Sequence, residues 1–132
     1  APRGEGLMRY VLLFVETEQF ERDLAVLGPE DRARAFELVG KWFADNADNI
    51  HHPGSKLQGA HTATTVRLEP GQEPLVTDGP FVEGKEIVSG YCEIDVADLD
   101  EALRMVRTWP GCPVVELRPI EDRPMPLVPP PP

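Results

Sequence analysis

The chain has 132 residues, 41% of them hydrophobic and 27% charged, which suits one soluble globular domain with its own hydrophobic core. The formal net charge is -10 and the basic residues are scattered, so we expect no direct binding of nucleic acid or anionic membranes. No apolar run approaches the about 18 residues of a membrane span, and no signal peptide is visible, so a cytoplasmic protein is expected.

The cysteines and the two ends set the expected limits of this domain. Cys92 and Cys112 are too few and too isolated for a disulfide framework or a zinc site, so both are expected to be free thiols. Residues 1–7 are interpreted as an artificial leader or a loose extension, and residues 121–132 as an extended or disordered proline-rich tail. A single domain is therefore predicted over residues 8–120, with no metal and no cofactor.

The first part of the domain predicts a central strand followed by a long helix. Arg9–Val15 is apolar on both faces, as in a strand in the middle of a sheet. Glu16–Leu27 is polar and mixed, with room for a helical turn, and residues 28–31 are typical of a helix start. This helix is expected to run for about four turns and to end in the poor helix formers of residues 45–49. Its buried face is predicted to consist of Ala33, Phe36, Val39 (or Gly40) and Phe43.

The middle of the chain predicts short strands and turns. Ile50–Ala60 contains Pro53-Gly54 and is expected to be a loop or hairpin. Residues 62–68 indicate a strand with one buried face, because Thr62, Thr64, Val66 and Leu68 alternate with Ala63, Thr65 and Arg67. A turn at residues 69–72, a short strand at Pro74–Thr77 and a longer strand at Ile87–Val96 are predicted to follow.

A second helix is predicted near the end of the domain. Asp98 can accept hydrogen bonds as its N-cap, and Glu101 three residues later completes a capping-box pattern. Pro110-Gly111 should stop the helix, and Val114–Arg118 should form the final strand. The apolar stripe of this helix is predicted to be Leu99, Ala102, Leu103, Val106 and Trp109.

The predicted order is β-α-β-β-β-α-β, with a short extra strand in the middle. It is typical of an α+β fold of the ferredoxin-like, split βαβ type, in which an antiparallel sheet carries two helices on one face. Because Arg9–Val15 is apolar on both sides, the other face of the sheet should be covered too. A second copy of the sheet is the simplest cover, so the sequence predicts a homodimer arranged as a dimeric α+β barrel.

Several segments, in sequence order, resemble the DGPF-motif branch of the YCII-related family. The most specific is the run from Asp78 to Glu86, DGPFVEGKE. It is accompanied by residues 8–13, 64–67, 90–91, 98–102 and 115–120, so the resemblance covers nearly all of the domain. Val82 stands where the family has alanine and Gly84 where it has threonine, which removes a hydroxyl group from the motif.

The resemblance implies a ferredoxin-like dimer with a small-molecule cleft near the dimer interface. Some YCII-related proteins are similar to small lyases or dehydrochlorinases that use a His–Asp pair, and genes of the DGPF branch often lie beside sigma-factor genes. Two hypotheses follow. The chain binds a small metabolite at the motif, with lyase-like or isomerase-like acid/base chemistry, or it is a non-catalytic binding or regulatory module of a sigma-factor system.

The candidate site is centred on the charged motif. Asp78 is interpreted as a general base or ligand anchor, or as a turn residue whose carboxylate accepts backbone N–H groups. Glu83 and Lys85 lie on one side of an extended segment and are candidates for substrate binding; the alternative is that both are solvated. His61 is the candidate catalytic partner of Asp78, and Arg67 could clamp a carboxylate; the alternatives are a solvent-facing histidine and an exposed strand arginine.

Overall fold

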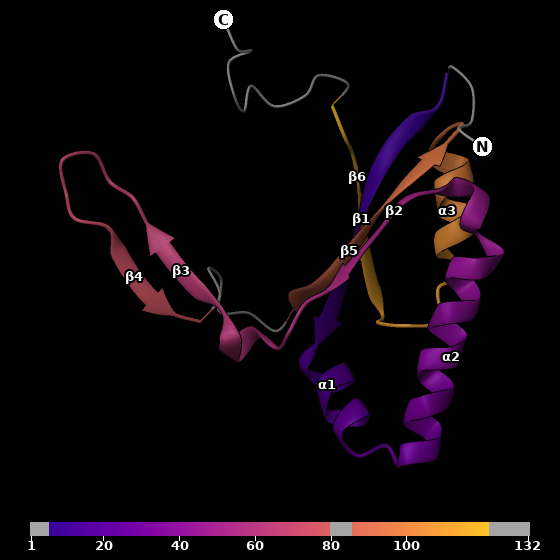
Figure 1. The fold of residues 1–132 in the computed structure, drawn as a ribbon, viewed down its shortest axis with the longest axis horizontal. Coiled ribbons are helices and arrows are strands. Elements are labelled where there is room, and N and C mark those ends of the chain that lie inside the picture. Colours follow the sequence, from indigo (N-terminus) through magenta and orange to yellow (C-terminus); the bar gives the residue numbers. More distant parts are fainter. Residues whose placement is uncertain (1–5, 80–85, 122–132) are drawn as a thin grey trace, which may run out of the picture.

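The computed structural model describes residues 6–79 and 86–121 of the chain. They form an α+β fold in which a four-stranded antiparallel sheet, in the order β2-β5-β1-β6, carries helices on one side (Figure 1). Its strands are β1 (Met8–Thr17), β2 (Ile50–Lys56), β5 (Glu86–Val96) and β6 (Val114–Pro119). This order is compatible with the expected ferredoxin-like arrangement, with β1 in the interior of the sheet as predicted.

Three α-helices lie within the described residues: α1 (Glu18–Ala25), α2 (Pro29–Asp45) and α3 (Leu99–Val106). Short 3-10 turns, η1 (Ala47–Asn49) and η2 (Ala60–Thr62), flank β2. The predicted caps are confirmed. Helix α2 begins at its proline, and the Asp98 carboxylate accepts the backbone N–H of Glu101 at 2.9 Å at the start of α3.

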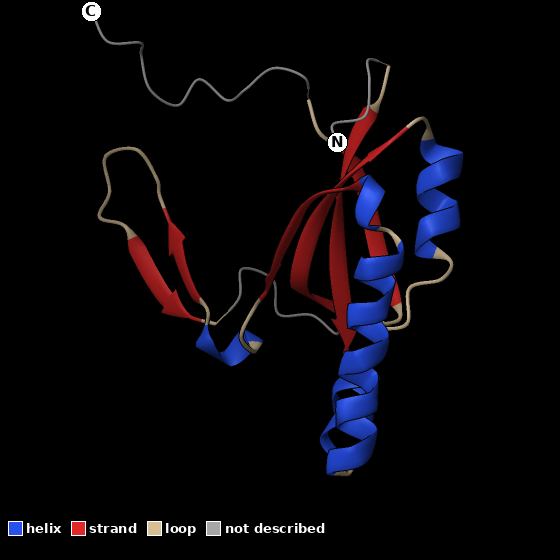
Figure 2. Cartoon of the chain, turned by 45° about the vertical axis from the view of Figure 1, so that its right-hand side comes forward, coloured by secondary structure: helices blue, strands red, loops and turns tan. Residues whose placement is uncertain are grey.

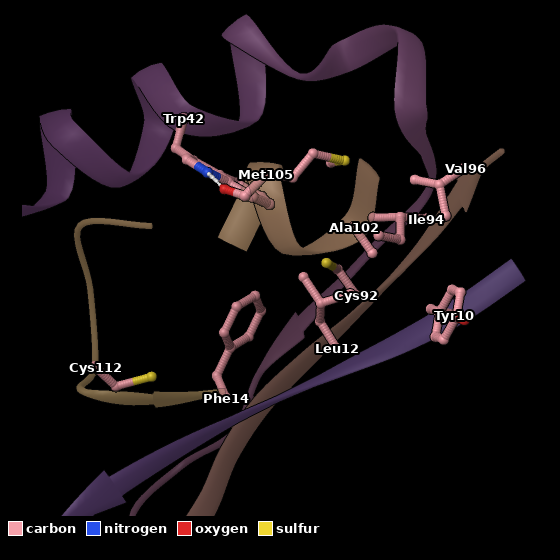
Figure 3. Packing of buried hydrophobic residues seen from close by; sticks show 10 residues of the cluster. All are labelled: Tyr10, Leu12, Phe14, Trp42, Cys92, Ile94, Val96, Ala102, Met105 and Cys112. Atoms are coloured by element: carbon pink, nitrogen blue, oxygen red, sulfur yellow. Dashed lines mark hydrogen bonds between the residues drawn. The ribbon is translucent and has the colours of Figure 1, made fainter. Parts of the chain in front are cut away.

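The hydrophobic core lies between the sheet and helices α2 and α3. Leu12 of β1 and Cys92, Ile94 and Val96 of β5 are fully buried on this side. Trp42 of α2 closes the layer from the helix side, and its indole N–H donates to the backbone oxygen of Met105 at 3.0 Å (Figure 3). One hydrogen bond therefore joins the two helices over the core.

The apolar faces of the helices differ from those predicted. In α2 the buried residue is Trp42, whereas the expected Phe36 is 70% exposed. Figure 1 shows the reason: the N-terminal half of α2 extends beyond the end of the sheet, so only its last turns have a surface to pack against. In α3 the predicted Ala102 is buried together with Met105, whereas the expected Leu99 is 47% exposed. The predicted Val106 and Trp109 pack against the core.

The sequence prediction was wrong about which segment completes the sheet. Ile50–Ala60, expected to be a loop or hairpin, supplies edge strand β2, which pairs with β5. Pro53 and Gly54 are tolerated because β2 has one neighbour and is bulged against it. Gly54 has φ +70°, and a Cβ at this position would lie 1.8 Å from the Tyr91 backbone oxygen, so only glycine permits this approach.

The segment expected to be a sheet strand forms a separate arm instead. Strands β3 (Thr64–Arg67) and β4 (Leu75–Asp78) pair only with each other among the described strands, and none of their residues is buried. We call residues 64–78 the arm. The turn predicted at its tip is confirmed, because Gln72 donates its backbone N–H to the oxygen of Glu69 at 3.1 Å. Figures 1 and 2 show the arm standing out on the side of the sheet opposite α2 and α3.

Candidate functional site

The face of the main sheet that points away from α2 and α3, here called the open face, carries an apolar strip. Its members alternate along the strands with the fully buried core residues, so the pleat turns them to the other side. Val11 and Leu13 of β1 and Tyr91 of β5 are half-buried. The prediction that β1 is apolar on both faces is therefore confirmed, and one of those faces is left partly exposed in the single chain.

A charged cluster lies on the open face beside this strip. Arg9 of β1 and Asp95 of β5 are directly opposite in the sheet register. The Arg9 side chain donates through Nε to Asp95 Oδ1 at 2.8 Å and through Nη2 to Oδ2 at 3.3 Å. From the neighbouring edge strand, His51 Nδ1 approaches Asp95 Oδ2 to 3.4 Å. Two side chains from the two neighbouring strands, Arg9 and His51, thus converge on the Asp95 carboxylate.

The electrostatics of the cluster centre on Asp95. Its hydrogen bond to Arg9 raises the pKa of the guanidinium, and the charges of Asp95 and Glu93 add to that effect against the opposing influence of burial. General acid–base catalysis often uses a histidine beside a carboxylate, and His51 Nδ1 lies 3.4 Å from Asp95 Oδ2. The cluster of Arg9, His51 and Asp95 is therefore chemically capable of moving a proton.

Other charges frame the apolar strip on the same face. Val11 lies between Glu93 on β5 and Arg118 on β6, and Arg118 Nη2 is 2.7 Å from Glu116 Oε2. The open face therefore has an apolar centre and a border that carries both signs of charge. Such a surface can pack against protein at its centre and hold a polar ligand at its edge.

Asp78 lies at the base of the arm, as the last residue of β4. It is exposed and pairs in register with Thr64 of β3. The next residue, Gly79, has φ +104°, and its backbone N–H donates to the oxygen of Ala63 at 2.7 Å. This φ lies in the left-handed region that is readily adopted only by glycine. Glu83 and Lys85 lie outside the described residues.

His61 and Arg67 also belong to the arm and its base. His61 is exposed in η2, with its ring over Gly59, where an added Cβ would lie 2.8 Å from the ring. Within residues 6–79 and 86–121, no hydrogen bond or ion pair joins His61 to Asp78, so their catalytic pairing stays a prediction. Arg67 is exposed in β3 opposite Leu75.

The cluster on the open face was not predicted from the sequence. His51 was assigned to a loop, and Arg9 and Asp95 are 86 residues apart, so no motif spacing connects them. The sequence contains one indication of the cluster: Arg9 and Asp95 each alternate with the core residues of their own strand, so both point to the opposite face. It indicates which face they occupy, but the partner depends on the strand register.

The cysteines are not candidates for the reacting group. Both are free and buried, as expected for structural thiols. Burial, together with the neighbouring charge of Glu93, raises the pKa of Cys92 to about 12, so its thiolate is not formed at neutral pH. Among residues 6–79 and 86–121, no three His, Cys, Asp or Glu side chains are grouped so as to hold a metal ion.

Comparisons with known proteins add little to this geometry. No family model matches the chain. A stretch of 55 residues is 46% identical to an uncharacterized protein of Rhizobium meliloti (strain 1021). The aligned stretch covers 42% of this chain and 44% of that protein, which is less than half of either. In the described part of the chain, no helix has the length and apolar character needed to span a membrane.

Proposed function

We propose that this chain is a YCII-related protein of the DGPF-motif branch that acts in the cytoplasm as a homodimer and binds a small carboxylate-bearing molecule. Lyase-like or isomerase-like acid/base chemistry is part of the proposal. The observation that carries it is the cluster of Arg9, His51 and Asp95 next to an apolar strip on the open face. A site of this kind combines a binding surface with a group that can move a proton.

The homodimer in this proposal pairs the open faces of two chains. Val11, Leu13 and Tyr91 lie in the middle of a sheet yet stay partly exposed, and contiguous apolar surface of this kind is normally covered. Face-to-face packing of two sheets would bury the strip and give the expected dimeric α+β barrel. Light scattering at micromolar protein concentration should give twice the mass of the chain, and a clear monomer would contradict this part of the proposal.

The proposed site includes residues of the motif and of the arm. Asp78 and His61 are the acid/base candidates from the sequence, and His51 with Asp95 is the pair formed on the open face. Glu83, Lys85 and Arg67 are the proposed substrate-binding residues. Among them, the guanidinium of Arg67 can hold a carboxylate with two parallel hydrogen bonds. The proposed lyase-like or isomerase-like chemistry begins when one of the acid/base candidates removes a proton next to that carboxylate.

The test is a thermal-shift screen of the full chain against a panel of small organic acids. A ligand of the site should raise the melting temperature of the wild type and lose that effect with Asp78→Asn or His51→Asn. Glu73→Gln, a charge change of the same kind near the tip of the arm, is the matched control and should keep the shift. Loss of the shift in all three variants would contradict the assignment of these residues.

The alternative is a non-catalytic binding or regulatory module, with a sigma-factor system as the expected partner. It is favoured by the lack of a hydrogen bond between His61 and Asp78 within the described residues. The same screen distinguishes the two functions. No shift with any organic acid, together with equal destabilisation by Asp78→Asn and Asp78→Ala, would leave Asp78 a turn residue and support the module.

A further inference from the structure

The arm has an apolar face that the single chain leaves uncovered. Val66 and Val76 lie directly opposite each other across its two strands and are 50% and 59% exposed. Leu68, where β3 runs into the turn, is 75% exposed. The other side of the ribbon carries the pairs Thr65–Thr77 and Arg67–Leu75, so it has one exposed leucine among polar residues. Within the described residues, the side of the ribbon that carries Val66 and Val76 is therefore its more apolar side, and it is not buried.

A ribbon of this kind requires an external contact to be well ordered. Two strands alone are marginally stable in water, and no residue of β3 or β4 is buried. At the base of the arm, Thr65 Oγ1 donates to the Gly79 oxygen at 2.6 Å, which ties the two strands of the ribbon together. A contact along Val66 and Val76 would supply the missing burial, worth about 25 cal/mol per Å² of apolar surface covered.

We propose that the apolar face of the arm docks on a second copy of this chain, so that Asp78 becomes part of a site built from two subunits. The inference rests on the homodimer of the proposed function. Both views place the arm on the same side of the sheet as the open face (Figures 1 and 2). A copy packed against the open face therefore occupies the space beside the arm, and two-fold symmetry gives each copy the same contact.

Other occupants fit the arm less well. Its tip carries Glu69 and Glu73, and the chain has a net charge of -10, so anionic lipid and nucleic acid are repelled. The docking face presents valine and leucine without a basic residue of its own. A second apolar protein surface suits this face, and the open face shows that this chain supplies one.

Docking of the arm bears directly on the motif. In β4, Asp78 is two residues after Val76, so both side chains leave the ribbon on the same face. When Val66 and Val76 contact the partner, Asp78 lies at the edge of that contact. Asp78 is then positioned by the neighbouring subunit, and a ligand bound to its carboxylate is held at the boundary between two chains.

The first experiment places a photo-reactive benzoylphenylalanine at position 76 of the full chain, in a preparation of two differently tagged copies. Illumination should give a cross-linked species of dimer mass that carries both tags. The same substitution at Thr77, on the opposite face of the arm, is the control and should give little of it. A dimer in solution that cross-links equally from both positions, or from neither, would overturn the inference while leaving the homodimer intact.

The second experiment separates docking from the ligand site. Val66→Asp combined with Val76→Asp should raise the dimer dissociation constant at least about tenfold, because two charges must be desolvated at the contact. Thr77→Asp should change it less than about twofold. Circular dichroism checks that the main sheet and its helices stay folded in these variants. An unchanged dissociation constant for the double variant, or an organic-acid shift that persists in its monomer, would contradict a site made by two subunits.

Discussion

The main sheet with its helices, here called the body, and the arm have the same alternating strand pattern but opposite environments. In β5, alternate residues Cys92, Ile94 and Val96 are completely buried beneath α2 and α3. In the arm, Val66 and Val76, which lie opposite each other on one face of the two strands, are at least half exposed. Alternation therefore indicates that a strand has an apolar face, and it does not indicate whether the same chain covers that face.

The largest expected difference between body and arm comes from two glycines with positive φ. In the body, Gly54→Ala would place a Cβ 1.8 Å from the Tyr91 oxygen, so the edge strand must move away from β5. We expect a loss of more than about 4 kcal/mol in the free energy of unfolding. Urea denaturation followed by the fluorescence of Trp42 and Trp109 measures it, because both tryptophans belong to the body.

The control is Gly71→Ala in the turn of the arm. Gly71 has φ +78°, yet no atom lies within 4 Å of an added Cβ, so only backbone strain is introduced. Since the arm adds nothing to the core, the free energy of unfolding measured by tryptophan fluorescence should change by less than about 1 kcal/mol. Equal effects at Gly54 and Gly71 would show that the close approach of β2 to β5 does not limit stability.

Loss of one leucine from each region sharpens the comparison further. Leu12 is fully buried, so Leu12→Ala should cost about 2 to 5 kcal/mol at every protein concentration. Leu68→Ala should cost less than about 0.5 kcal/mol in dilute solution, where the chain is monomeric. Denaturation curves over a range of concentrations test this. An effect of Leu68→Ala that does not grow with concentration would argue against a covered arm.

Hydrogen bonds give a smaller contrast. The Trp42 indole N–H donates to the Met105 oxygen at 3.0 Å and to Thr108 Oγ1 at 3.1 Å beneath the helices, so Trp42→Phe should cost about 1 to 3 kcal/mol. Thr65→Val removes the 2.6 Å bond at the base of the arm and should cost under about 1 kcal/mol, because water can replace that partner. Both are measured by urea denaturation.

Trp109 is the matched control for Trp42. Its ring stacks on Phe14 at 4.2 Å, but its buried indole N–H has no hydrogen-bond partner within the described part of the chain. Trp109→Phe should therefore lose no hydrogen bond and cost less than Trp42→Phe. The reverse order would show that packing of the indole ring, and not its N–H, dominates in this cluster.

Cys92 gives the body a pH dependence that the arm does not share, because the arm contains no cysteine. Burial raises the pKa of its thiol to about 12, above that of an unfolded cysteine at about 8.5. The folded state then holds the proton more tightly, so this contribution to stability is complete below about pH 8.5 and declines as pH rises toward 12. Cys92→Ala should flatten the fall in stability between pH 8 and pH 10, measured by urea denaturation against wild type.

A thiol reagent tests the same difference between the regions. Cys92 should react with it only after unfolding, whereas a cysteine introduced by Thr77→Cys in the exposed arm should react at once. Rapid reaction of Cys92 in the native protein at pH 8 would contradict its deep burial.

Much of the fold was predictable because its signals are local. Strand β1, the start of α2 and the cap of α3 each follow from a short stretch of sequence, and the structure confirms them. Strand β2 was missed because Pro53 and Gly54 are ordinarily strand breakers, and only its place at the sheet edge lets them remain. Of the candidate site, the sequence placed Asp78 at a turn, whereas the cluster around Asp95 depends on the register of three strands.

What the sequence determined by itself is the set of helices and strands with strong periodicity, and the presence of an apolar side on the arm. Periodicity is a property of neighbouring residues, so it can be read without the fold. The tertiary structure decided which strands share the main sheet, which face of that sheet the helices cover, and which charges meet on the open face. Those outcomes depend on contacts between distant residues, such as Arg9 with Asp95, that no local pattern encodes.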